Sequence, residues 1–153
     1  MMLDYLQTTC WSVTYVLLII YAITYKMCGI PSVPLALNYA WETVALFITL
    51  FFNRNMVSLL MHGAWFSLDA VIVFLFLSLR GIPRKSKAVF WIVYTLSVVY
   101  FAVANEKLLL ASYVIDFLMA VVFLLFSLFC KIKKGFIAYG IALLKLLGDF
   151  LPG

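Results

Sequence analysis

Residues 33–52 read VPLALNYAWETVALFITLFF, an apolar stretch with one charged residue, Glu42, at its middle. A helix of about 20 predominantly apolar residues is long enough to cross the hydrocarbon core of a bilayer. The stretch therefore predicts a transmembrane helix. A carboxylate at the centre of such a helix costs about 2.5–3.5 kcal/mol on insertion scales, and ionisable residues at that depth usually serve a function. We expect Glu42 to have partners inside the protein.

The composition extends this prediction to the whole chain. Of its 153 residues, 67% are hydrophobic and 11% are charged, whereas soluble domains are about 45–50% apolar. Further apolar stretches that predict transmembrane helices occupy residues 11–27, 56–79, 88–104, 108–130 and 135–151. The predicted fold is all-α: a polytopic integral membrane helical bundle of about six transmembrane helices, forming a single domain over residues 1–153.

The positive charges lie mainly in alternate links between the predicted helices. One set of links holds Lys26, Arg80, Arg84, Lys85, Lys87, Lys131, Lys133 and Lys134, and the other set holds Arg54 and Lys107. Because cytoplasmic loops carry the excess of lysine and arginine, we expect the basic loops in the cytoplasm and both termini on the opposite side. This placement accounts for the net charge of +5 without a nucleic acid. The expected partners are membrane lipids and a lipophilic substrate, and the oligomeric state is not indicated.

Three acidic residues, Glu42, Asp69 and Asp116, fall well inside predicted helices. Any one of them could be a structural group, hydrogen-bonded to Ser, Thr or Asn on a neighbouring helix with a modest net stabilisation. Three carboxylates at membrane depth in a chain of this size favour a shared polar cavity instead.

Polar and aromatic residues accompany each carboxylate at helical spacing, where residues three or four positions apart share a face. The predicted substrate-binding residues are Asn38 and Trp41 near Glu42, His62 and Trp65 near Asp69, and Ser112 with Asp116 on a later helix. Taken alone, a histidine such as His62 is more often a hydrogen-bonded helix residue than a catalytic one. Lys145 and Asp149, one turn apart, could likewise form a plain ion pair.

A buried carboxyl group beside aromatic rings is suited to acid catalysis on a lipid. Burial favours the protonated form of a carboxyl group because the charged form loses its hydration, so Glu42 could act as a proton donor. Tryptophan and tyrosine faces could stabilise a carbocation by cation–π attraction. The same residues would suit a small proton-coupled transporter, and a non-catalytic membrane binding or assembly subunit is a third alternative. No metal site and no cofactor are predicted.

The order of several motifs resembles that of a known family. The motifs are CGIP (residues 28–31), ALNYAWE (36–42), WFSLD (65–69), residues 113–123, and a glycine at 135 followed by KLLGD (145–149). Together they resemble the transmembrane-type terpene cyclases of fungal meroterpenoid and indole-diterpene biosynthesis and their smaller bacterial relatives. The resemblance covers most of the chain, and ALNYAWE is its most specific part.

The resemblance implies a metal-independent cyclase that protonates a lipophilic isoprenoid epoxide or olefin. The predicted catalytic residues are Glu42 as the proton donor, Asp69, and Asp149 as the counterpart of a late acidic residue of the family. Asp69 is expected to hydrogen-bond or reprotonate Glu42, with Asn38 orienting it. The chain departs from the family pattern in two ways: it has about six predicted helices rather than seven, and Asp116 stands where the family has an asparagine.

Overall fold

The computed structural model of the chain describes residues 2–26, 28, 30–53 and 55–103, together with eight isolated positions: Phe117, Val121, Leu125, Gly140, Ile141, Leu143, Leu144 and Leu147. Its elements are α1 (Met2–Tyr25), α2 (Ser32–Ile48), a π-helical turn η1 (Thr49–Asn53), α3 (Met56–Ser78) and α4 (Arg84–Val103). The predicted all-α bundle is confirmed for these four helices. The predicted helices over residues 108–130 and 135–151 lie outside the described residues, apart from the isolated positions, which are helical.

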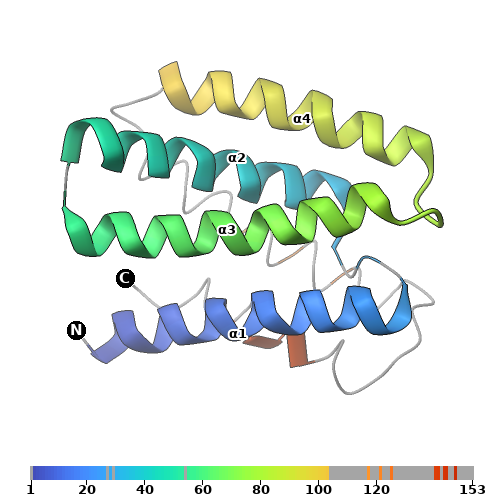
Figure 1. The fold of residues 1–153 in the computed structure, drawn as a ribbon, viewed down its shortest axis with the longest axis horizontal. Helices are drawn as coiled ribbons and strands as arrows, with labels where there is room; N and C mark the ends of the chain where they lie inside the picture. Colours follow the sequence, from blue (N-terminus) through green and yellow to red (C-terminus); the bar gives the residue numbers. More distant parts are fainter. Residues whose placement is uncertain are drawn as a thin grey trace.

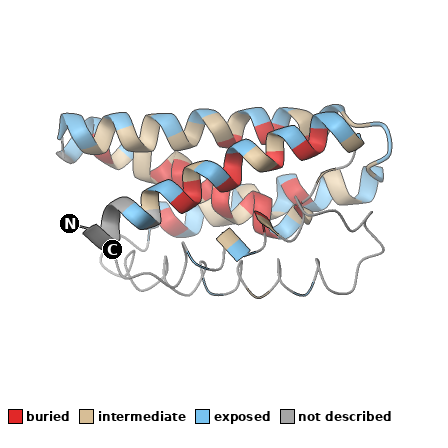
Figure 2. Ribbon diagram, turned by 90° about the horizontal axis from the view of Figure 1, so that it is seen from below, coloured by how far each residue is buried: buried red, intermediate tan, exposed pale blue. Residues whose placement is uncertain are grey.

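The four helices run side by side and alternate in direction along the chain (Figure 1). α2 packs against both α3 and α4, and α1 packs against α3. Buried residues lie on the faces that meet inside the bundle (Figure 2). The outward faces carry exposed apolar side chains such as Phe51, Phe74 and Leu96. In a bilayer these side chains contact lipid tails of similar polarity, so their exposure carries no hydrophobic cost.

Each of the four helices is long and apolar enough to cross a membrane. The spans are Thr8–Tyr25, Ser32–Phe52, Met56–Ser78 and Arg84–Val103. The protein is therefore an integral membrane protein, as the composition predicts. Glu42 and Asp69 both fall inside these spans.

Two helices begin earlier than predicted. α1 begins at Met2 rather than at residue 11, because residues 2–10 contain no proline or glycine that would end a helix. Trp11, at the predicted start of the helix, is buried inside the bundle. α4 begins at Arg84, directly after Pro83, rather than at residue 88. Its first turn tolerates charge because the Lys87 ammonium donates to the last carbonyls of α3, those of Leu77 (2.5 Å) and Leu79 (3.1 Å).

Proline and asparagine set the starts of the two helices that carry the central carboxylates. Pro31 precedes α2 in extended conformation, and Pro34 lies in the first turn, where its missing N–H would have had no helical partner. Asn55 caps α3, since its side-chain oxygen accepts a hydrogen bond of 3.0 Å from the backbone N–H of Val57. Between α2 and α3, the π-helical turn η1 takes the place of a last α-helical turn of α2. Such π-helical turns often occur near functional sites.

Candidate active site

Glu42 lies at the middle of the span formed by α2 and η1 and is 1% exposed. Its Oε2 atom is 3.3 Å from Nδ1 of His62 on α3. If the carboxyl group is protonated, it donates to a neutral imidazole; if it is ionised, an imidazolium donates to it. The pair can therefore hold one proton on either side chain.

A second polar cluster lies one turn before Glu42 on α2. The Nδ2 atom of Asn38 donates to Oδ2 of Asp69 at 2.5 Å and to the hydroxyl of Tyr15 at 2.8 Å. All three side chains are buried, and Asp69 is 0% exposed. Because these residues come from α2, α3 and α1, the hydrogen bonds fix the rotation of three helices relative to one another.

Aromatic rings connect the two polar clusters along the α1–α3 contact. The Trp65 ring meets the His62 ring edge-on, with centroids 5.9 Å apart. Its centroid is also 6.1 Å from that of Trp11, which in turn lies 5.9 Å from that of Tyr15. A cation formed near this row of rings would gain electrostatic stabilisation from their faces.

A separate set of aromatic contacts joins α2 to α4. Trp41 meets Phe101 of α4 edge-on at 5.6 Å between ring centroids. Tyr39 stacks at 5.2 Å on Phe66 and at 5.2 Å on Tyr94. The Tyr39 ring therefore links α3 and α4 through α2.

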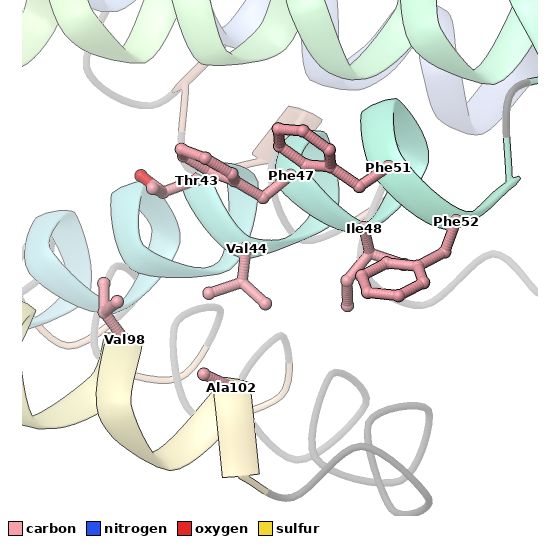
Figure 3. A pocket seen from close by; sticks show the side chains of 8 residues that line it. All are labelled: Thr43, Val44, Phe47, Ile48, Phe51, Phe52, Val98 and Ala102. Atoms are coloured by element: carbon pink, nitrogen blue, oxygen red, sulfur yellow. The ribbon is translucent and has the colours of Figure 1, made fainter.

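An apolar cavity of about 540 Å³ lies between the second half of α2, η1 and α4 (Figure 3). It is lined by Thr43, Val44, Phe47, Ile48, Phe51, Phe52, Val98 and Ala102. Among the residues that the structure describes, neither Glu42 nor Asp69 lines it. The cavity faces α4, whereas Glu42 contacts α3, so the cavity and the acid lie on different sides of α2.

The structure places six of the nine predicted site residues: Asn38, Trp41, Glu42, His62, Trp65 and Asp69. It brings five of them close to one another between α1, α2 and α3, while Trp41 packs toward α4. The sequence prediction paired Glu42 with Asn38 and Asp69. The structure shows a contact of Glu42 with His62, and a hydrogen bond from Asn38 to Asp69. Ser112, Asp116 and Asp149 lie outside the described residues.

Sequence reasoning missed Tyr15, which supplies the hydroxyl that accepts from Asn38. A signal was present: Trp11, Tyr15 and Leu18 recur at spacings of four and three, and all three are buried. Tyrosine in a membrane helix is also expected at an interface, so its type alone did not indicate an interior contact.

The described side chains offer acid–base chemistry and a lining of aromatic rings. Glu42, His62 and Asp69 are acid–base side chains, and Glu42 and His62 are in contact. Trp65 and Trp11 supply apolar ring faces beside His62. In the described part of the chain, no group of three His, Cys, Asp or Glu side chains lies close enough to hold a metal ion.

We compared the sequence with protein families, curated proteins and solved structures to identify the family of this protein. A family model of Pyr4-like transmembrane terpene cyclases matches residues 1–138. The match covers α1 to α4 and both polar clusters, and it ends before Asp149. Comparisons with curated proteins and with solved structures each gave no match. The resemblance inferred from the motifs is confirmed, and the chain belongs to the family of Pyr4-like transmembrane terpene cyclases.

Proposed function

We propose that the protein cyclises a linear isoprenoid and that Glu42 starts the reaction by protonating a terminal epoxide or olefin. The observation that supports this most directly is the environment of Glu42. Its carboxyl group is 1% exposed at mid-membrane depth and has an imidazole 3.3 Å away. In this proposal the carboxyl group is the general acid that gives its proton to the substrate.

The proposed step conserves atoms and charge. The Glu42 O–H bond breaks and its proton goes to the epoxide oxygen, or to the terminal carbon of an olefin. The resulting cation is attacked by the electrons of an internal double bond, which forms the ring bond. Loss of a proton from a neighbouring carbon then gives a neutral cyclic product with the same mass as the substrate.

Other residues of the site have supporting roles in this proposal. Asp69, held by Asn38 at 2.5 Å, is the second acid–base group and a candidate acceptor for the released proton. Trp65 lies between the two clusters and offers its face to the cation, as the row of rings around it suggests. Asp149 remains a proposed catalytic residue on the family resemblance alone.

The experiment is a comparison of lipids from cells that express the wild-type chain or the Glu42→Gln variant. Mass spectrometry should find a cyclic isoprenoid with the wild type and none with the variant. Glutamine keeps the size and hydrogen-bonding capacity of the side chain but cannot supply the proton. Thr95→Ala is the matched control, because Thr95 is exposed on α4 and, among the described residues, takes part in neither polar cluster. The same product from Glu42→Gln would overturn the proposal.

A proton-coupled carrier is the alternative that the residues alone support. It predicts uptake into proteoliposomes that depends on a pH gradient and leaves the covalent structure of the substrate unchanged. Membership of a terpene cyclase family favours the enzyme.

We also propose that the basic links face the cytoplasm. Lys26 follows α1, and the link from Arg80 to Arg84 joins α3 to α4; both lie at the same end of the bundle (Figure 1). Clustering of positive charge at one end is the pattern of cytoplasmic loops. A reporter fused after residue 82 and one fused within residues 53–55 should report opposite sides, and identical labelling would contradict this orientation.

A further inference from the structure

Each turnover under the proposed function leaves Glu42 without its proton, and the side chain is too deeply buried to recover one from water directly. Glu42 is ten residues from either end of the span Ser32–Phe52. At 1.5 Å per residue this places it about 15 Å from both membrane surfaces. A group that connects Glu42 to a surface is therefore required.

His62 is positioned to make that connection. Its side chain is 25% exposed, compared with 2% for the Glu42 side chain it contacts at 3.3 Å. It lies six residues after the first residue of α3, Met56, which is about 9 Å along the helix axis. The imidazole therefore reaches from a shallower, more accessible depth to the buried carboxyl group.

Polar side chains continue from His62 toward the start of α3. Ser58 is one turn closer to the helix start on the same face and is partly exposed. Asn55, the cap of α3, is exposed. Glu42 is thus buried, His62 and Ser58 are partly exposed, and Asn55 is exposed.

We propose that His62 is a proton-relay residue that returns a proton to Glu42 after each turnover, drawing it from the surface at the η1–α3 end of the bundle. In this step the imidazolium Nδ1–H bond breaks and the proton passes to Oε2 of the Glu42 carboxylate. The neutral imidazole keeps its Nε2–H; a turn of the ring brings the free nitrogen toward the surface, where it takes up the next proton from water. This inference rests on the proposed function, but the exchange path itself does not require a substrate. Asp69, the residue expected from sequence to hydrogen-bond or reprotonate Glu42, receives a hydrogen bond from Asn38 and keeps its proposed role as the second acid–base group.

The test follows exchange of the Glu42 carboxyl proton by infrared spectroscopy after rapid mixing of the liposome-reconstituted protein with deuterated water. Glu42→Gln identifies the band by removing it. Positioned acid–base groups accelerate proton transfer by about 10²–10⁴-fold, so His62→Gln is expected to slow the exchange by about 10²-fold or more. Ser67→Ala is the matched control, because Ser67 is exposed on the same helix and bonds only to Gly63 of its own helix among the described contacts. It should exchange at the wild-type rate.

A second variant separates a relay from a structural role. His62→Gly leaves a space beside Glu42, and added imidazole should restore fast exchange in this variant and have no effect on Ser67→Ala. Wild-type exchange rates in His62→Gln would overturn the relay, as would a failure of imidazole to accelerate exchange in His62→Gly, or the absence of a protonated Glu42 band at neutral pH. The two proposals can be rejected independently of each other. Slowed exchange in His62→Gln together with unchanged product in Glu42→Gln would support the proton path through His62 and reject the catalytic role of Glu42.

Discussion

The hydrogen bonds of Asn38 should hold α1 and α3 to α2, and removing them should weaken the fold by a measurable amount. Asn38→Ala deletes the donor that reaches Tyr15 at 2.8 Å and Asp69 at 2.5 Å. Tyr15→Phe deletes the Tyr15 acceptor and leaves the ring in place. Both residues are buried, so water cannot replace the lost partner within the folded bundle.

The expected energies follow from the chemistry of each pair. Hydrogen bonds between membrane helices contribute about 0.6 kcal/mol on average and at most about 1.7 kcal/mol. The bond between Asn38 and Tyr15 joins two neutral groups and should fall in this range. The bond to Asp69 should contribute more if the carboxylate is charged, about 1.5–3 kcal/mol.

The assay is a double-mutant cycle on the free energy of unfolding in mixed detergent micelles. Asn38→Ala, Tyr15→Phe and the double variant give the coupling between the two side chains. The matched control cycle replaces Tyr15→Phe by Ser12→Ala, because Ser12 is on the same helix and its hydroxyl bonds back to Thr8 at 2.8 Å. We expect coupling in the first cycle and none in the second. Equal coupling in both cycles, or none in either, would refute this expectation.

Three further predictions concern the ends of the helices. Burial raises the pKa of the Cys28 thiol from its ordinary value of 9.0 to about 11. In a Cys10→Ala, Cys130→Ala background, maleimide should therefore label Cys28 about 10²-fold more slowly at pH 8 than an unperturbed thiol. The labelling rate should still rise between pH 9 and 11. Because the Cys28 thiol stays protonated to a higher pH in the folded state than in the unfolded state, the free energy of unfolding should also fall as the pH rises from 9 to 11. A labelling rate that levels off above pH 9 would contradict both expectations. Lys87→Met should lower the free energy of unfolding by about 1 kcal/mol through loss of the hydrogen bonds to the last carbonyls of α3, whereas Lys85→Met should have little effect. Asn55→Ala should cost about 1 kcal/mol by removing the cap of α3, and Asn55→Asp should retain most of that stability.

The sequence was sufficient to predict the fold class because membrane helices are specified by local apolar length. α2 and α3 lie close to the predicted stretches 33–52 and 56–79, since proline and asparagine mark their starts. The predicted start of the first helix at residue 11 was wrong, because it followed the start of the apolar stretch, whereas the helix itself begins at Met2. The π-helical turn η1 has no comparable local signal.

The partners of each polar residue could not be predicted in the same way. Helical periodicity places Asn38 and Glu42 on one face of α2, but it does not set the rotation and vertical register of α3 against that face. Those variables decide that Glu42 meets His62 and that Asn38 meets Asp69. Tyr15 was missed for the same reason, because its partner lies 23 positions away along the chain.

The central claim is that Glu42 donates the proton that starts cyclisation. The most direct measurement is the rate at which purified protein in liposomes converts the linear isoprenoid identified from expressing cells, for the wild type, Glu42→Asp and Glu42→Gln. We expect partial activity for aspartate, which keeps an acid, and a loss of about 10²-fold or more for glutamine, which does not, with all three proteins equally stable. Wild-type turnover by the folded Glu42→Gln protein would contradict the claim.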